Sequence, residues 1–304
     1  MQENKIKNLL VLHFIVFIWG FTAILGKLIS IEAIPLVFLR MFLAVLFMLL
    51  YFIIKKHSFL ISRKAILKFL LTGIIIALHW IFFFKAIKVS NISVALVTMS
   101  TGAFFTALLE PIFFKRKISL QEIFFGLLVI IGLYVIFNFE NHFKLGILYA
   151  LLASFLGALF SVLNGLFVKE YKATTITLYQ LFFGVLFIAI YILFTSGITG
   201  LFFKVSTTDW LYLIILSSIC TAYAFMASVK VMKFLSPYTV MLTTNLEPIY
   251  AILLALLIFG ENEKMEATFY LGAVIVLGVV LVNGIIKNKN RRSRKLSQEI
   301  SRKN

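Results

Sequence analysis

Glu247 and Arg40 lie well inside long apolar stretches of the sequence, where a charge is costly to place. A charged side chain at the bilayer centre costs about 2.5–3.5 kcal/mol on insertion scales. Glu247 stands about ten residues, or ~15 Å, from either end of its stretch, so its carboxylate does not reach the membrane surface. Pro248 follows it and removes a backbone donor. We interpret Glu247 as a contact for a substrate amine or a proton carrier, or alternatively as a carboxylate paired within a helix bundle.

Arg40 is the other charged residue within such a stretch, roughly six residues, or ~9 Å, from its predicted outer end. The planar guanidinium suits bidentate capture of a substrate carboxylate. A long arginine side chain also reaches the membrane interface from this depth, so snorkelling is the alternative interpretation.

His79 and several aromatic or neutral polar residues complete the candidate site. A lone histidine in an apolar helix is typical of a hydrogen bond between helices, and a proton relay is the alternative. The aromatic candidates form walls for an apolar or cationic substrate, or else serve as packing and interface residues. They are Trp19, Trp80, Tyr179 and Tyr223. The neutral polar candidates line a pathway or bond between helices. They are Thr98, Asn164, Thr243 and Asn245.

The sequence predicts no metal site, no cofactor and no enzymatic activity. The four histidines are too scattered for a metal cluster by local spacing, and a single cysteine, Cys220, excludes a disulfide within the chain. The sequence has no glycine-rich phosphate loop, and no connection between apolar stretches is long enough for a catalytic domain. A polytopic membrane enzyme, a channel and a scaffold remain as alternatives to a carrier.

The composition predicts an all-α membrane protein that positions these residues. Of 304 residues, 62% are hydrophobic and 13% are charged, whereas soluble domains have roughly 45–50% apolar and ~25% charged residues. A bilayer core of ~30 Å needs about 20 mostly apolar residues per helix. The chain divides into ten such spans, which are Leu9–Ile29, Ile34–Ile54, Ile66–Phe84, Ile92–Phe114, Ile118–Phe137, Gly146–Val168, Thr174–Phe194, Trp210–Val229, Pro237–Phe259 and Thr268–Ile286.

The formal net charge of +17 reflects topology rather than a nucleic-acid partner. With the N-terminus inside, the inner side carries 22 Lys and Arg residues, of which 8 lie in the tail from residue 287 onward, and the outer side carries 6. Because positive residues accumulate on the cytoplasmic side, we predict a multi-pass protein of the inner (cytoplasmic) membrane with both termini in the cytoplasm. The basic tail is expected to touch anionic lipid.

An internal repeat divides the chain into two halves. Lys85 to Lys88 align with Lys230 to Lys233 at an offset of 145, and Arg40 aligns with Gln180 at an offset of 140. Each half has five spans, an odd number, so the second half is inverted relative to the first. We predict one five-helix repeat over residues 1–138, an inverted repeat over 139–286 and a basic tail over 287–304. Inverted repeats are typical of secondary transporters, whose substrate site lies where the halves meet.

The chain resembles the EamA-type branch of the drug/metabolite transporter superfamily over essentially its full length. The residues that carry the resemblance are Trp19 to Phe21, Arg40, Asn245 to Pro248, Phe259 to Glu261, Gly272 and Gly278. The resemblance implies a ten-helix fold and export or exchange of small metabolites such as amino acids. The first half departs from the family, which usually has proline in the fourth helix and then Gly-Glu, whereas this chain has Gly102 followed by Ala103, and then Lys115 followed by Arg116.

These observations together predict a secondary transporter, and from the resemblance an exporter. We expect a small-molecule substrate, held between the halves by Arg40, Glu247, His79 and Gln180 with the aromatic and neutral residues named above. Transport is expected to be energised by protons, if Glu247 is a proton carrier, or by the substrate gradient alone.

Overall fold

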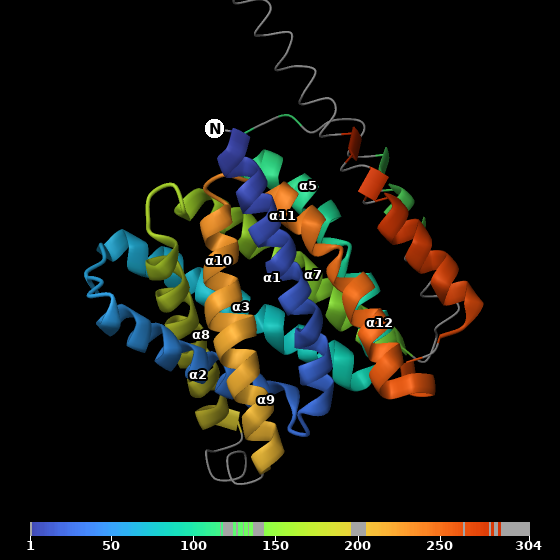
Figure 1. Ribbon diagram of the computed structural model, residues 1–304, viewed down its shortest axis with the longest axis horizontal. Coiled ribbons are helices and arrows are strands. Elements are labelled where there is room, and N and C mark those ends of the chain that lie inside the picture. Colours follow the sequence, from blue (N-terminus) through green and yellow to red (C-terminus); the bar gives the residue numbers. More distant parts are fainter. Residues whose placement is uncertain are drawn as a thin grey trace, which may run out of the picture.

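The structure is a computed structural model that describes residues 2–115, 143–195, 205–263 and 265–279, with single positions between 117 and 135 and between 281 and 286. These residues form a bundle of helices and contain no β-strand (Figure 1). Hydrophobic side chains pack along the whole interior of the bundle, and a single large cluster joins both halves of the chain.

Five helices form the described part of the first half. They are α1 (Gln2–Leu28), α2 (Ala33–Ile54), α3 (Arg63–Val89), α4 (Ile92–Met99) and α5 (Gly102–Phe113). Short polar caps fix where two of them begin, because the first N–H groups of a helix have no partner within it. The Ser62 hydroxyl accepts from Ala65 at the start of α3, and Asn91 Oδ1 accepts from the Val94 N–H at 2.8 Å in α4.

The second half begins with two long helices and continues with a series of shorter ones. They are α7 (Lys144–Phe167), α8 (Ala173–Thr195), α9 (Thr207–Ser217), the π-helix η2 (Ser218–Tyr223), α10 (Ala224–Val231), α11 (Pro237–Thr244), α12 (Glu247–Phe259) and the 3₁₀ turn η3 (Gly260–Glu263). A capping box at Ser206 and Asp209 starts α9. α9, η2 and α10 run on without a break as one transmembrane element.

The fourth and ninth predicted spans are each broken in the middle, into α4 and α5 and into α11 and α12. Pro248 has no N–H to bond the carbonyl four residues earlier, and Asn245 and Leu246 bond three residues back instead. In the first half the Thr101 hydroxyl donates to the Thr98 carbonyl at 2.8 Å, which competes with helical bonding. α4 packs against α12 and α5 against α11, so the two broken spans lie side by side.

Close approach of helices depends on glycine at one crossing in particular. A Cβ atom at Gly73 in α3 would lie 2.5 Å from the Gln180 carbonyl oxygen of α8 and 3.1 Å from the Gly184 nitrogen. Both of those atoms belong to the backbone, so they cannot move away independently of the helix. The crossing holds Gln180 against α3.

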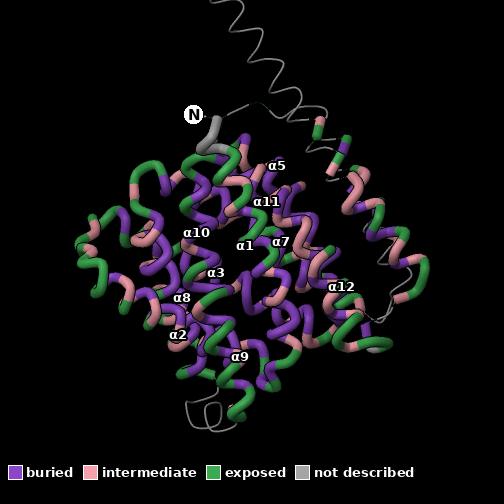
Figure 2. Tube along the Cα trace, viewed as in Figure 1, coloured by how far each residue is buried: buried purple, intermediate pink, exposed green. Residues whose placement is uncertain are grey.

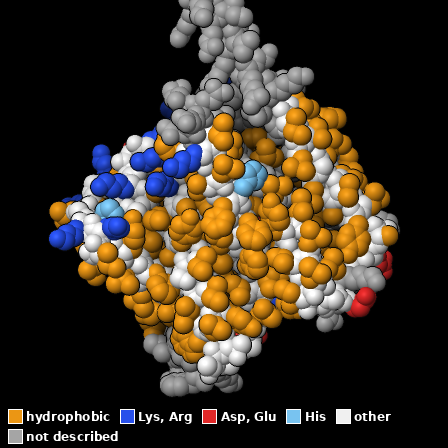
Figure 3. All heavy atoms as spheres, in the orientation of Figure 1, with side chains coloured by type: hydrophobic (Ala, Val, Ile, Leu, Met, Phe, Trp, Pro, Cys, Tyr) orange, Lys and Arg blue, Asp and Glu red, His pale blue; other side chains and the backbone are white. Residues whose placement is uncertain are grey.

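The surface is that of a membrane protein. Figure 2 shows buried residues concentrated inside the bundle and exposed residues on its outer faces. Many exposed residues are large and apolar, among them Leu10, Ile53, Leu67 and Leu257. Figure 3 shows a largely hydrophobic face with Lys and Arg side chains gathered at one edge. A soluble protein rarely exposes apolar area on this scale, whereas lipid accommodates it.

Among the described residues, eight helical segments are long and apolar enough to cross a bilayer. They correspond to the predicted spans one to four and six to nine. The structure extends the third predicted span to Arg63–Val89 and the eighth to Thr207–Val231. The predicted fifth span lies largely outside the described residues. Of the tenth, a shorter apolar helix at Ala267–Val279 is described, and Phe269 and Val276 in it pack with Val94 of α4.

Candidate functional site

Arg40 points into the protein rather than toward a membrane surface. Its side chain is 1% exposed, and Nε donates to the Thr221 hydroxyl of η2 at 2.6 Å. The guanidinium carbon lies 4.2 Å from the centre of the Trp80 ring and 5.4 Å from that of Phe84. These contacts rule out the snorkelling interpretation for this structure. The aromatic faces attract the cation and shield it from water.

Most of the N–H donors of the Arg40 guanidinium form no hydrogen bond with a described residue. Arginine presents five N–H donors, and the bond from Nε to Thr221 is the one that reaches a described residue. Nη1 is buried without a partner. A buried cation whose donors are unsatisfied is costly unless something else fills them. The free edge of Arg40 therefore has the chemistry of a receptor for an anionic or strongly accepting group.

Glu247 is the first residue of α12, at the break in the ninth span. Its side chain is half-buried, and its carboxylate accepts no hydrogen bond from a described residue. Glu247 and Arg40 attract one another electrostatically, but they lie beyond the 4.0 Å that defines an ion pair. The N-terminus of a helix favours a negative charge, which helps to hold this carboxylate inside the protein. The two opposite charges thus lie close enough to attract one another but do not form an ion pair.

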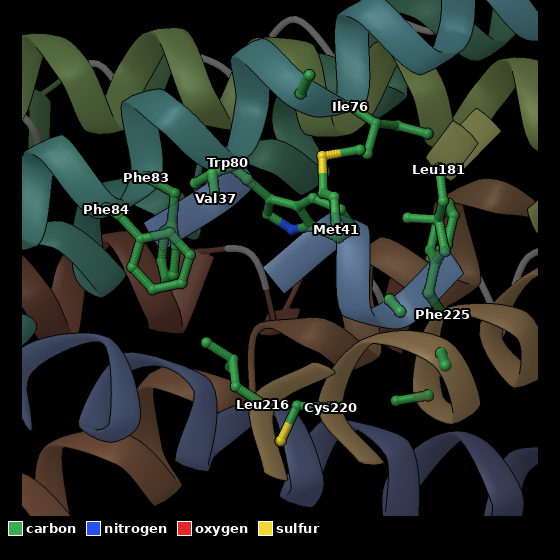
Figure 4. Close-up of a cluster of buried hydrophobic side chains, with 14 of the residues drawn as sticks. Val37, Met41, Ile76, Trp80, Phe83, Phe84, Leu181, Leu216, Cys220 and Phe225 are labelled. Atoms are coloured by element: carbon green, nitrogen blue, oxygen red, sulfur yellow. The ribbon is translucent and has the colours of Figure 1, made fainter. Parts of the chain in front are cut away.

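Aromatic and apolar side chains enclose the Arg40 end of this region. Figure 4 shows Trp80 of α3 beside Met41 of α2, Phe84 next to Phe83 further along α3, and Leu216 and Cys220 on the α9–η2 segment on the other side of the view. Phe225 of α10 meets the Trp80 ring edge-on at 5.9 Å. These side chains belong to the packed hydrophobic core, so the surroundings of Arg40 are apolar.

His79 adjoins the aromatic enclosure but is already engaged. Its Nδ1 lies 2.7 Å from the Ala153 carbonyl oxygen of α7, and because a carbonyl only accepts, Nδ1 carries the proton. The ring packs edge-on against Phe160 at 5.1 Å. These contacts match the interpretation of His79 as a bond between helices.

Gln180 belongs to a second polar cluster, separate from Arg40. Its Nε2 donates to Asn164 Oδ1 at 2.7 Å and to the Thr72 hydroxyl at 3.0 Å, so α3, α7 and α8 are joined. Gln180 Oε1 and Asn164 Nδ2 are buried without partners. The arrangement parallels that of Arg40, where a donor from the second helix of a half reaches a threonine of the other half.

Three neutral candidates lie at or beside the helix breaks. Asn245 caps α11 and its Nδ2 is buried without a partner, as is the Thr98 hydroxyl near the end of α4. The Thr243 hydroxyl donates to the Thr239 carbonyl within α11. Asn245 therefore offers a free polar atom two residues before Glu247, and Thr98 offers one in the facing broken span. Thr243 offers none, because its hydroxyl is already bonded.

The remaining aromatic candidates are not brought to Arg40. Trp19 Nε1 donates to the Cys220 carbonyl at 3.2 Å and ties α1 to η2. The Tyr179 hydroxyl donates to the Phe59 carbonyl in the connection between α2 and α3. Tyr223 is 44% exposed on the outside of the bundle. Trp80 is thus the aromatic candidate that the structure places at Arg40.

Sequence reasoning missed Thr221, Phe84 and the π-helix that presents Thr221. A π-helix leaves no compositional signature, although such turns occur often at functional sites. The available signal was a small polar residue, Thr221, in the middle of the eighth span. Among the described residues, no group of His, Cys, Asp and Glu could hold a metal ion.

Two carboxylates join the broken spans at opposite ends of the bundle. Glu263, which is fully buried, pairs with Lys27 at 2.5 Å and accepts the N–H groups of Ile92 and Ser93 at 3.1 Å each. We call this set of contacts the Glu263 closure.

The opposite end has a similar contact. Glu110 near the end of α5 accepts the Tyr238 N–H at the start of α11 at 2.9 Å. We call this contact the Glu110 closure. In each closure, a carboxylate at the end of one broken span caps the beginning of the other.

Comparison with known proteins gives a consistent result. The profile described as "EamA-like transporter family" matches the chain twice, over residues 6–138 and 144–284. The uncharacterized transporter YxxF of Bacillus subtilis (strain 168) is 23% identical over 227 residues, covering 73% of this chain and 68% of its own length. An uncharacterized transporter of Clostridium kluyveri is 24% identical, covering 65% of each chain. One solved crystal structure, described only as that of a protein, aligns with a TM-score of 0.68 at 13% identity and covers 93% of this chain and 98% of its own.

Proposed function

Because the chain belongs to the EamA-like transporter family, we propose that it is a secondary carrier of small metabolites whose substrate binds between Arg40 and Glu247. One observation carries the proposal. Two opposite charges lie within spans two and nine and interact electrostatically without forming an ion pair, and Arg40 Nη1 is buried without a partner among the described residues. Ionisable groups within membrane spans mark substrate or ion pathways by default, since any purely structural use would pair them fully.

The helix breaks support two inverted halves with the site at their junction. At the breaks, three boundaries of the second half follow those of the first by 145 residues: α4 and α11 start at 92 and 237 and end at 99 and 244, and α5 and α12 start at 102 and 247. This is the offset at which the lysine pairs align in the sequence. Discontinuous helices at matching positions of two inverted repeats are typical of carriers, and their half-helix ends face the substrate. Glu247 occupies such an end.

The closures support alternating access. To admit a substrate from one side, a carrier must separate its halves at that side while they stay joined at the other. The Glu263 closure joins α12 to α4 and α1, and the Glu110 closure joins α5 to α11 at the opposite end. Opening toward one side would break one closure and spare the other.

Orientation and direction follow from charge and family. The Lys and Arg side chains gather at one edge in Figure 3, and positive residues favour the cytoplasmic side. We propose that the protein lies in the inner (cytoplasmic) membrane with both termini in the cytoplasm. Export of amino acids or related compounds is the direction and substrate class that the family resemblance implies.

Counterflow in proteoliposomes tests the proposed function. Purified protein is reconstituted, the vesicles are loaded with a small-molecule extract of the host cells, and exchange against an isotope-labelled extract is followed by mass spectrometry. We expect saturable exchange of a small set of metabolites, lost in Arg40→Gln and retained in Arg63→Gln, which removes an exposed arginine at the start of α3. Flux without counterflow would identify a channel, and no flux of any metabolite would refute the carrier.

A further inference from the structure

We infer that the site carries a monoanion together with one proton, the anion on the Nη atoms of Arg40 and the proton on the carboxylate of Glu247. The inference rests on the proposed function and narrows it to metabolites with a net negative charge. It combines three observations, namely the free guanidinium edge, the unbonded carboxylate and the charge balance between them.

The Arg40 end fixes the chemistry of the bound group. Nε is anchored on Thr221 at 2.6 Å, and the rings of Trp80 and Phe84 hold the guanidinium plane, so the Nη edge is presented in one orientation. A rigid guanidinium edge matches the two oxygens of a carboxylate or sulfonate in a fork-to-fork pair. The aromatic side chains around it favour an apolar or aromatic body on that anion.

Charge balance then couples the anion to a proton. With Arg40 positive and Glu247 negative, the empty site has no net charge. An anion added alone leaves one uncompensated negative charge in a low-dielectric interior, and a proton added alone leaves one positive charge. Anion and proton added together restore neutrality. Each therefore strengthens the binding of the other, as thermodynamic linkage requires.

The other titratable groups near Arg40 and Glu247 are not suited to carry the transported proton in place of Glu247. From η2 comes Cys220, whose thiol lies against the Ile18 carbonyl of α1. From α3 comes His79, held on Ala153 and repelled by Arg40 when protonated.

The other charges around α12 are already compensated. Lys27 of α1 and Glu263 of η3 neutralise one another. The sequence of α4, which packs on α12, contains no ionisable side chain, and α11 contributes Tyr238 at its far end. Glu247 is thus the carboxylate whose charge the bound anion opposes.

Binding of a strong-acid anion across pH tests the inference. The probe is benzenesulfonate, which stays ionised throughout, titrated calorimetrically into the purified full-length protein between about pH 6 and pH 9. We expect wild-type affinity to fall as pH rises, by up to about tenfold per pH unit once Glu247 ionises in the empty site. Glu247→Gln should bind the probe with affinity that does not change with pH.

Matched variants separate this from a structural effect. Arg40→Gln should lose binding, and Arg40→Lys, which keeps the charge, should bind more weakly with the wild-type pH dependence. Glu170→Gln alters an exposed carboxylate paired with Lys68 at 2.9 Å and should behave as wild type. Benzyltrimethylammonium, the cationic counterpart, should not compete.

Three results would overturn the inference: no binding of benzenesulfonate to the wild type, binding that is independent of Arg40, or a pH dependence that survives in Glu247→Gln. Counterflow is measured on the same protein preparation. Counterflow together with any of these results would leave the carrier standing and remove the anion–proton site. Absence of counterflow would instead refute the proposed function.

Discussion

Replacing Glu263 by glutamine should loosen one end of the protein and make its interior reactive. In the Glu263 closure the buried carboxylate accepts from Lys27 at 2.5 Å, from Ile92 and Ser93 N–H at 3.1 Å, and from the Ser93 hydroxyl at 3.2 Å. Glutamine keeps the shape, but it removes the charge and turns an NH₂ group toward these donors.

The size of the effect follows from where the charge sits. A carboxylate at a partly buried helix N-terminus contributes up to about 2 kcal/mol. The Lys27 side chain is 27% exposed, so solvent screens its pairing and we add nothing for it. A loss of about 2 kcal/mol from the closed state raises the open fraction about 30-fold, since 1.4 kcal/mol is a factor of ten.

Cys220 reports the opening without further engineering, because it is the one cysteine of the chain and is 2% exposed. Its sulfur lies 3.8 Å from the Ile18 carbonyl oxygen, on the helix that carries Lys27 about 14 Å further along. The assay is the rate at which a membrane-impermeant methanethiosulfonate modifies Cys220 in proteoliposomes. When opening is fast and rare, this rate follows the open fraction, so we expect an increase of about 30-fold.

Glu266→Gln is the matched control, because Glu266 is exposed and lies three residues from Glu263 in the sequence. It should react at the wild-type rate. Melting temperatures of both variants, measured in the same detergent, show whether the reactive species is the folded protein. An unchanged Cys220 rate in folded Glu263→Gln would refute the closure.

Three further predictions concern stability and are checked by thermal unfolding in detergent. Gly73→Ala should cost about 1–3 kcal/mol, because its Cβ would lie 2.5 Å from a backbone oxygen, whereas Gly278→Ala, with nothing within 4 Å, should be neutral; equal melting temperatures would contradict the tight crossing. Trp19→Phe should cost about 1 kcal/mol by deleting the bond to the Cys220 carbonyl, and a wild-type melting temperature would show that this bond contributes nothing. Asp209→Asn should cost about 1–2 kcal/mol, because the Asp209 carboxylate caps α9 and accepts hydrogen bonds from Ser30 in the loop between α1 and α2. A melting temperature above that of the wild type would contradict this.

Most of the fold was predictable from hydropathy alone. The second predicted span, Ile34–Ile54, begins within one residue of α2, and the ninth, Pro237–Phe259, has the limits of α11 and α12 taken together. The breaks inside two spans were not predicted, because the length of an apolar stretch does not show which backbone hydrogen bonds form within it. Pro248 indicated one of them. Its counterpart at Ser100 and Thr101 has no proline and depends on hydroxyl bonds that only the fold reveals.

The candidate site was predictable in its charges and not in its contacts. Arg40 and Glu247 stood out because a charge in an apolar stretch is rare and costly. Whether Arg40 turned inward depended on Thr221, 181 residues away in sequence, and on the π-helix that carries it. The role of Glu263 was hidden for a similar reason, since its partners lie on α1 and α4, far away in the sequence.

Alternation between the two closures is the central claim, and distances between spin labels at the two ends test it most directly. One pair, Leu28 with Glu266, reports the Glu263 end, and the other, Phe113 with Lys233, reports the Glu110 end. In proteoliposomes we predict two distance populations for each pair, with Glu263→Gln lengthening the first pair and shortening the second. A single unchanging distance at both ends, or lengthening at both together, would contradict a carrier that opens to one side at a time.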